Sequence, residues 1–484
     1  MSRFRSSRPS PRGTLSGSSA GVASPPPKTA LRPFVTTPAI TIPAHQPAPV
    51  QTPRRLGGAD ALRQSELDNP LRKLGLYFAI AFIFCRFSLF GEVVSNTFNF
   101  DPHVARILGI PTIILALTTG GLWRVLRSRL TLVWLGLVVW MMMSAPVSFW
   151  PGGSASLILN YVRGQLPMLL IAGGLILTWK ECRLVLLAMA AASVVNVMSG
   201  KLFAVNADSG TRLNLELGTI GNANDFTAHL FFVLPFVIFV MLISERGWIR
   251  RILCLGVLAY GLYFCATTGS RGGLVAFAAV CAFILIRAPG RVRIGALAAA
   301  VALFFLMVTV LPQSMLHRYA TLFSDDSNDQ EAVQSTAART SLLRYSIQFT
   351  LQHPFLGVGP GEFSDYQASV AKSAGKKGAW QVTHNAYTEV SSEIGIPGLL
   401  LYLAAIVMSF RAFGRAYRVA RHHPQLRSMA MACFCCQMSI VGFCTATIFL
   451  SLAFTMYLPT ISGLALAISR SLHRELGQIQ PRTQ

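Results

Sequence analysis

The amino-acid sequence predicts an all-α polytopic membrane protein, and three observations support this fold class. Hydrophobic residues make up 52% of the 484 residues and charged residues only 13%, whereas about 25% of a soluble domain is charged. The apolar residues form long uninterrupted blocks, which a backbone inside hydrocarbon can accommodate only as helices or as a closed barrel. The blocks are too long and too uniformly apolar for the alternating strands of a barrel, so we expect a bundle of transmembrane helices.

The first 68 residues differ from the rest of the chain. They are rich in Pro, Ser, Thr and Arg and show no helical or strand period. Such a segment cannot bury enough apolar surface to offset the entropy of ordering, so we expect residues 1–68 to form a disordered cytoplasmic tail. No apolar segment follows the early arginines, and we therefore expect no signal peptide.

After this tail, a window of about 19 residues finds about twelve apolar segments. They lie approximately at 74–96, 105–123, 130–149, 159–178, 183–199, 226–244, 250–269, 272–288, 293–312, 394–412, 428–446 and 448–468. The fifth is short and the last two are nearly continuous. We expect about 12 transmembrane helices, nine within 69–312 and three within 394–470.

The positions of Lys and Arg orient these segments, because the cytoplasmic connections of membrane proteins carry most of the positive charge. With the N-terminus in the cytoplasm, the inside connections hold 19 Lys and Arg. The short outside connections hold four, which are Arg106, Lys201, Arg212 and Arg271. This asymmetry accounts for most of the net charge of +23 without a nucleic-acid partner. Both termini, including a short tail at 471–484, are expected in the cytoplasm, and the polar loop 313–393 outside it.

Arg271 is the most informative single position. It lies in the turn 267–273 (TTGSRGG) between two long apolar segments, on the side that otherwise lacks positive charge. The flanking glycines let a ligand approach the backbone closely, and a fixed guanidinium there can bind a phosphate through two hydrogen bonds. The alternative is an ordinary arginine whose charge reaches the membrane interface.

The loop 313–393 contains a predicted amphipathic helix and two further arginines. After Arg339 the apolar residues recur at helical spacing, Pro354 ends this helix, and the glycines of 357–361 (GVGPG) predict a tight turn. Arg339 and Arg344 are five residues apart and do not share one face of the helix, although they can reach a ligand from neighbouring turns. Each of them can equally be a solvated surface arginine.

His384 and Asn385 close the loop before the next apolar segment. An imidazole near neutral pH can take a proton from an acceptor hydroxyl, and a neighbouring amide can orient the ring or bind a sugar. A lone histidine at a membrane interface can also be structural. A further outside segment, 199–225, adds Arg212 and a polar run before the sixth apolar segment.

No sequence signal indicates a metal or a nucleotide cofactor. The acidic run at 325–331 lacks the glycine and the final glutamate of an EF-hand, and HExxH, Walker A and dinucleotide-binding patterns are absent. The nine cysteines fall almost entirely within apolar segments, where they are typical small apolar residues. We therefore expect no cofactor and no metal.

Four short motifs occur in order on the expected outer side of the membrane. They are residues 221–226 (GNANDF), 268–273 (TGSRGG), Arg339 followed by 354–361 (PFLGVGPG), and 384–387 (HNAY) leading into 393–400 (EIGIPGLL). Together they resemble the O-antigen ligase and O-antigen polymerase superfamily of bacterial inner-membrane glycosyltransferases. The motifs cover about 200–412, and the number of spans and the large outer loop extend the similarity to most of the chain after residue 70.

The resemblance implies a C-class transmembrane glycosyltransferase fold with a periplasmic catalytic loop, an inner-membrane location and a metal-independent reaction. Such enzymes move a glycan from a polyprenyl diphosphate, with inversion, to an acceptor hydroxyl at the periplasmic face. The diphosphate leaving group needs fixed cations, which Arg271 and Arg339 are expected to supply. His384 is expected to orient or deprotonate the acceptor hydroxyl. The residues expected to bind substrate are Arg212, Arg344 and Asn385.

The acceptor distinguishes the functions that are left open. In a ligase it is a sugar of lipid A–core, in a polymerase it is another lipid-linked repeat unit, and related members glycosylate proteins. We expect a ligase-like enzyme, with an O-antigen or exopolysaccharide polymerase as the alternative. A transporter of lipid-linked sugars is the remote alternative. A transporter predicts ionisable residues or broken helices at the membrane midplane, whereas the polar groups of this sequence gather at one membrane face and in one loop. The expected partners are the lipid-linked donor, a glycan or glycolipid acceptor and the bilayer.

Overall fold

The computed structural model describes residues 64–203, 220, 222–243, 247–288, 330–375, 377–378 and 380–479, together with scattered positions between 290 and 319. Its regular structure is helical, which confirms the all-α class. The helices are α1 (Gln64–Asp68), α2 (Pro70–Phe87), α3 (Phe90–Phe98), α4 (Ile110–Thr118), α5 (Gly121–Leu126), α6 (Arg129–Ser144), α7 (Pro151–Asn160), α8 (Pro167–Leu175), α9 (Trp179–Phe203), α10 (Ala223–Ile243), α11 (Trp248–Thr267), α12 (Arg271–Arg287), α15 (Gln330–Gln352), α16 (Phe363–Ser373), α17 (Ala386–Ala420), α18 (Arg427–Ala446) and α19 (Tyr457–Ile479).

Seven helical segments of the described chain are long and apolar enough to cross a membrane. They are Arg129–Val147, Pro151–Leu175, Trp179–Gly200, Ala223–Ile243, Trp248–Thr267, Ala386–Ala420 and Pro424–Phe449. The pair α2 and α3, bent by 62°, forms an eighth if it is one span. The protein is therefore a multi-pass membrane protein.

The expected number of about twelve spans is met only in part by the described residues. The apolar segment 105–123 breaks at Gly120, whose φ of +77° starts α5 as a separate short helix. Helix α12, with 17 residues, coincides with the expected span 272–288, whereas α19 overlaps only 457–468 of the expected span 448–468, because residues 450–456 are not helical. Neither helix is among the seven. The expected span 293–312 lies largely outside the described residues.

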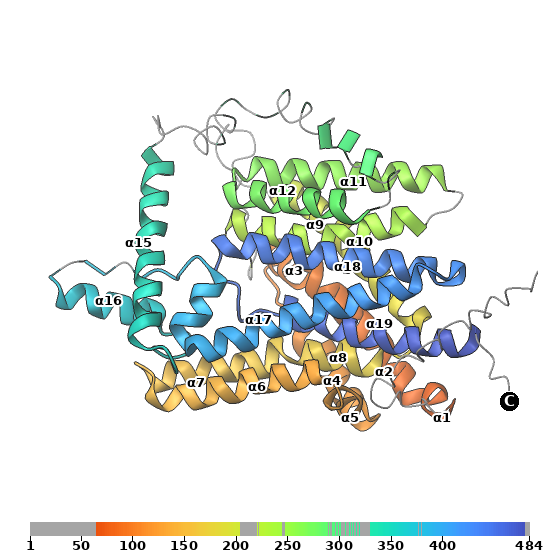
Figure 1. Ribbon diagram of the computed structural model, residues 1–484, viewed down its shortest axis with the longest axis horizontal. Coiled ribbons are helices and arrows are strands. Elements are labelled where there is room, and N and C mark those ends of the chain that lie inside the picture. The colour runs from red at the N-terminus through yellow and green to blue at the C-terminus, as the bar shows by residue number, and fades with distance from the viewer. Residues whose placement is uncertain are drawn as a thin grey trace, which may run out of the picture. The chain divides into compact units, whose positions relative to one another are not determined.

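Helices α10 and α18 form the centre of the bundle and pack against each other. In the most apolar stretch of each, 72% of the residues are buried, compared with 28% in α11. A helix that is apolar on all sides belongs in an interior, and α10 buries Phe226, Phe232, Phe236 and Phe239 almost completely. Helix α17 packs against α18, α6 and α19 and extends this core (Figure 1).

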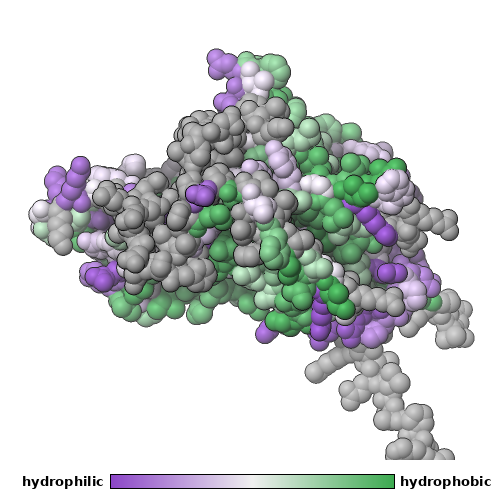
Figure 2. Space-filling view, turned by 90° about the horizontal axis from the view of Figure 1, so that it is seen from above, coloured by the Kyte–Doolittle hydropathy of each residue, from purple (hydrophilic) through white to green (hydrophobic). Residues whose placement is uncertain are grey.

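Large apolar surfaces remain outside this core. Exposed apolar side chains on α6 and α11 include Leu132, Val139, Met142, Ile252 and Leu253, and Figure 2 shows broad apolar areas on one face of the molecule. Soluble proteins rarely expose continuous apolar surface on this scale. Lipid contact on these faces explains why the sequence contains so few charged residues.

Helix α15 lies across the ends of the membrane-crossing helices rather than alongside them (Figure 1). The sequence predicted an amphipathic helix here, which is confirmed: Leu342, Ser346 and Phe349 are buried, and Arg344 and Gln348 are exposed. The following transmembrane helix begins earlier than expected. Helix α17 starts at Ala386, and a kink with non-helical geometry at Ile394 and Gly395 divides it into two helical pieces. The expected start at 394 falls at this kink.

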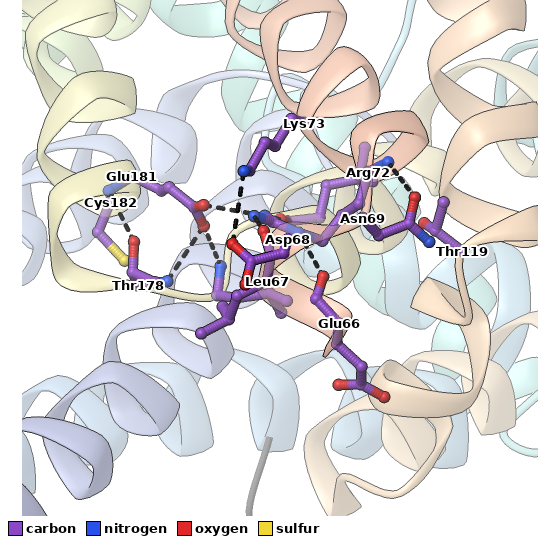
Figure 3. Close-up of polar contacts among 12 residues, drawn as sticks. Glu66, Leu67, Asp68, Asn69, Arg72, Lys73, Thr119, Thr178, Glu181 and Cys182 are labelled. Atoms are coloured by element: carbon purple, nitrogen blue, oxygen red, sulfur yellow. Dashed lines mark hydrogen bonds and ion pairs between the residues drawn. The ribbon is translucent and has the colours of Figure 1, made fainter. Parts of the chain in front are cut away.

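Arg72 fixes the corner where α1, α2, α8 and α9 meet, as Figure 3 shows. Its side chain is 2% exposed and forms an ion pair with Glu181 at 2.9 Å. It also donates to the backbone carbonyls of Glu66 at 3.0 Å, Leu67 at 3.0 Å and Leu175 at 3.2 Å. The other carboxylate oxygen of Glu181 accepts from the backbone N–H groups of Leu177 and Thr178, just before α9, at 2.7 and 3.1 Å.

The expected disordered tail, residues 1–68, is wrong at its C-terminal end. Residues 64–68 form α1, because Arg72 bonds two of its carbonyls. The rest of the expected tail, 1–63, lies outside the described residues.

Candidate active site

The motif around Asn222 begins helix α10. The Asn222 side-chain oxygen accepts from the N–H groups of Asn224 at 2.9 Å and Asp225 at 3.1 Å, and its amide donates to the Asp225 carboxylate at 2.8 Å. This is the arrangement of a helix N-cap. Asp225 adds a negative charge in the first turn, where the helix dipole favours it. Part of this motif is therefore explained by the start of a helix.

The motif around Arg271 begins a second helix, α12, whose first turn lies against the first turn of α10. Ser270 is its N-cap, and the Ser270 hydroxyl accepts from the Gly273 N–H at 3.1 Å. A Cβ on Gly272 would lie 2.7 Å from the Phe449 ring, and one on Gly273 would lie 2.6 Å from the Thr227 methyl group. The two glycines thus let α12 begin in direct contact with α10 and with the segment after α18.

A small pocket lies between these elements. Its lining residues come from the starts of α10 and α12, from α15 and from the end of α18 with the turn that follows: Asn224, Thr227, Ser270, Gly272, Gly273, Arg339, Ala446, Phe449 and Leu450. Arg339 brings a positive charge to the wall. Arg271 is half-buried and lies between two lining residues, Ser270 and Gly272. The pocket therefore brings together four segments that are far apart in the sequence.

His384 lies next to the same wall. Its backbone N–H donates to the Ser451 hydroxyl at 2.9 Å, and Ser451 directly follows the lining residue Leu450. The side chain of His384 is half-buried, and its backbone is in the left-handed region with φ of +51°. Non-glycine residues rarely adopt this conformation, and such residues cluster at functional sites.

The surroundings of His384 disfavour the protonated form of its ring. Burial lowers the pKa of His384 below the ordinary value of 6.5, and the positive charge of Arg339 lowers this pKa further. A neutral imidazole is available to accept a proton near pH 7.

Asn385 has a structural contact that its sequence position did not reveal. Its side-chain oxygen accepts from the N–H groups of Tyr387 at 2.9 Å and Thr388 at 3.1 Å, which makes Asn385 the N-cap of α17. Three helices, α10, α12 and α17, thus begin around this region. Helix N-termini carry partial positive charge and bind anions, so the site is suited to a phosphorylated ligand.

Two glycine-rich motifs join the end of α15 to the break in α17. The N–H groups of Val358 and Gly359 donate to the carbonyls of Ser392 and Glu393, both at 2.9 Å, and the Ile396 N–H donates to the Pro354 carbonyl at 2.8 Å. These bonds hold the turn 354–361 against α17.

Glycine is required at both contact points of this junction. Gly357 and Gly395 have φ of +68° and +74°. A Cβ on Gly357 would overlap the Glu393 backbone, and one on Gly395 would overlap the Phe355 carbonyl. These glycines therefore position the helix that carries Arg339 without contacting the pocket.

The structure places three of the residues expected from the sequence at or beside the pocket, and Asn385 directly follows one of them. Arg339 lines the pocket, Arg271 lies between two lining residues, and the His384 backbone bonds Ser451, which follows a third. Arg344 is exposed on α15 and does not line the pocket, and Arg212 lies outside the described residues. Within the described residues, no three His, Cys, Asp or Glu side chains are grouped as around a metal ion.

Sequence reasoning missed two contributors to this site. Asn224 lines the pocket and Ser451 bonds His384. The helix starts could have been found from the Asn-x-x-Asp pattern at 222–225 and from Ser270 before an apolar run, since both are N-cap signals. Ser451 had no comparable signal.

Residues 256–403 match the family model described as O-antigen ligase. The matched segment contains Arg271, Arg339 and His384, and it confirms the superfamily resemblance found in the motifs. No curated protein is significantly similar to the chain.

Proposed function

We propose that this protein, which carries a segment of the O-antigen ligase family, is an inverting glycosyltransferase of the ligase type. It moves a glycan from a polyprenyl diphosphate to an acceptor hydroxyl, in lipid A–core or a similar glycolipid, at the periplasmic face of the bacterial inner membrane. The reaction is metal-independent. Both termini are cytoplasmic, and about twelve helices with a C-class architecture carry the periplasmic loop.

The observation that carries this proposal is the pocket between the first turns of α10 and α12, with Arg339 in its wall and His384 beside it. Helix N-termini and guanidinium groups both stabilise phosphate oxygens. A neutral histidine next to such a site is suited to take a proton from a nucleophile. This pairing of an anion site and a base supports group transfer from a phosphorylated donor.

The residues support a single displacement. The imidazole of His384 takes the proton of the acceptor hydroxyl, and the oxygen forms a bond to the anomeric carbon. The bond between that carbon and the diphosphate oxygen breaks, and the diphosphate leaves with the electron pair. Arg271 and Arg339 stabilise the negative charge that develops on it. The diphosphate linkage already activates the donor for transfer, so the reaction needs no nucleotide.

The distribution of charge supports the orientation. The nineteen Lys and Arg of the inside connections, against four in the short outside ones, support a position outside the cytoplasm for Arg271 and for the loop with Arg339 and His384. Polyprenyl-linked glycans offered at that side would meet the pocket directly.

A strain that lacks this gene tests the proposal against its alternatives. If its lipid A–core is bare and long lipid-linked glycans accumulate, the protein acts as a ligase. Core capped with single repeat units identifies a polymerase instead, and loss of a secreted polymer with unchanged core identifies a polymerase of another pathway. Surface glycans that are unchanged on a gel beside the parent strain would contradict the enzyme assignment.

A further inference from the structure

Ser451 connects the segment after α18 to the backbone of His384. Its hydroxyl accepts from the His384 N–H at 2.9 Å and also bonds the Thr383 hydroxyl at 2.9 Å. Thr383 is 2% exposed, and its hydroxyl donates to the Asn385 carbonyl at 3.1 Å. A hydroxyl has one hydrogen, so the consistent arrangement has Ser451 donating to Thr383 and accepting from His384.

The hydrogen bond to Ser451 stabilises a strained backbone conformation at His384. His384 has φ of +51°, and residues other than glycine keep such a conformation only where the surrounding structure holds them in it. The buried Thr383 side chain and the Ser451 hydroxyl hold the two residues that lead into α17. Without Ser451, the His384 N–H would lose the acceptor seen in the structure, and the left-handed conformation would lose a stabilising contact.

The same segment also forms the wall of the anion pocket. Phe449 and Leu450 line the pocket, and Ser451 is the next residue. Two residues further on, the Ala453 N–H donates to the Glu389 carboxylate of α17 at 3.2 Å. The stretch from 449 to 453 therefore contacts the pocket at one end and α17 at the other, with the bond to His384 between them.

We propose that Ser451 is a positioning residue that holds His384 at a fixed place relative to the pocket, so that the base and the anion site keep their separation. This inference rests on the proposed function. It assigns no contact between Ser451 and the substrate. Ser451 acts through the backbone of His384, and Thr383 is the second member of the same hydroxyl chain.

The first test is Ser451→Ala in the full-length protein, reconstituted in nanodiscs with a polyprenyl-diphosphate glycan as donor and lipid A–core as acceptor. We expect kcat to fall by about 10- to 100-fold, because a small displacement of a base from its acceptor has an effect of this size. The KM for the donor should change little, since the groups expected to bind the diphosphate remain. Ser451→Thr keeps the hydroxyl and should recover most of the lost rate.

The pH profile provides a readout that a general loss of stability would not change. A loosened His384 becomes better hydrated, and the pKa that burial now lowers would return towards its ordinary value. The acid limb of kcat/KM should therefore move to higher pH in Ser451→Ala. Arg339 is the charged neighbour known to act on His384, and it is unchanged in this variant.

Two further variants keep the test decisive. Thr383→Val removes the second hydroxyl while preserving shape, and it should reproduce the loss of kcat and the shifted profile even if Ser451→Ala folds poorly. Ser373→Ala is the matched control, because Ser373 is an exposed serine of α16 that bonds only its own helix carbonyl at 2.8 Å in the described contacts. It should behave as the wild type.

Comparison with His384→Ala separates this inference from the proposed function. Wild-type kcat and pH profile in both Ser451→Ala and Thr383→Val, with His384→Ala inactive, would overturn the positioning role alone. Full activity of His384→Ala would overturn the base assignment and this inference with it. A loss in Ser451→Ala that Ser451→Thr does not recover, together with a normal Thr383→Val, would also overturn it.

Discussion

The two ends of the helical bundle use arginine in opposite ways. At the expected cytoplasmic end, Arg72 is 2% exposed, and its guanidinium bonds three backbone carbonyls and the Glu181 carboxylate. At the other end, Arg271 and Arg339 are half-buried beside a pocket. Helices α1 and α2 mark the first region in Figure 1, and α15 marks the second.

Helix dipoles explain what this difference means. Arg72, Arg124 and Arg470 all donate to carbonyls of the last residues of α8, at 173–175. A helix C-terminus carries partial negative charge, so these cations are balanced within the protein. Arg271 and Arg339 instead lie beside the starts of α10 and α12, where the partial charge is positive. Guanidinium groups and helix N-termini both attract anions, so this end of the bundle is suited to a negatively charged ligand in a way that the Arg72 end is not.

Removing the base should have the largest effect on transfer. His384→Ala is expected to reduce kcat by about 100- to 10,000-fold, the usual contribution of a general base, while the protein still inserts and folds. Initial rates in nanodiscs, with the folded fraction checked by size-exclusion chromatography, measure this directly. Transfer at the wild-type rate would show that the pocket end contains no essential histidine.

The pH dependence of the wild type follows from the lowered pKa of His384. A lowered pKa keeps the imidazole neutral to more acidic pH, so the midpoint of the acid limb of the activity profile should lie below pH 6.5. Arg339→Gln removes the positive charge that contributes to this shift, and it should move the fall to higher pH. An unchanged acid limb in Arg339→Gln would indicate that another group controls it.

Replacing Arg271 should have the next largest effect. Arg271→Ala is expected to lower transfer by about 100- to 1,000-fold, as for the loss of one fixed donor to a developing anion. Arg271→Lys keeps the charge without the planar two-bond geometry, so its loss should be intermediate. Arg344→Ala is the matched control, because this arginine is exposed on α15 outside the pocket wall. Equal losses in Arg271→Ala and Arg344→Ala would argue against the pocket as the anion site.

A smaller effect is expected at the junction that positions α15. Gly395→Ala combines a φ of +74° with an overlap on the Phe355 carbonyl, so we expect a loss of at least about 1 to 3 kcal/mol in stability and a partial loss of transfer. Gly375→Ala is a useful control, since Gly375 has a similar φ of +68° but no described neighbour within 4 Å of its Cβ position. If both variants lose the same stability, strain rather than the backbone contact explains the glycine.

The sequence predicts local structure and motif residues well, because both depend on short-range pattern. Apolar blocks located most of the membrane helices, and helical spacing located α15. The motif that contains Gly395 was recognised, but its contact with Phe355 depends on a backbone 40 residues away and has no local signature. Ser451 is similar, because an isolated serine in an apolar region acquires its meaning only when His384, 67 residues away, lies beside it.

The smallest effect on transfer is expected at the opposite end of the bundle. Arg72→Met leaves the Glu181 carboxylate buried without its cation, which typically costs about 3 to 5 kcal/mol of stability. Transfer per folded molecule should stay close to the wild type, since Arg72 bonds only protein acceptors in the described contacts.

The double variant Arg72→Met with Glu181→Leu should lose less stability than the sum of the single changes, because it removes the unpaired charge. Thermal unfolding in detergent beside transfer rates measures both quantities. Arg271→Ala should show the reverse pattern, and a loss of activity without a loss of stability in Arg72→Met would mean that the two ends do not divide structural and catalytic roles.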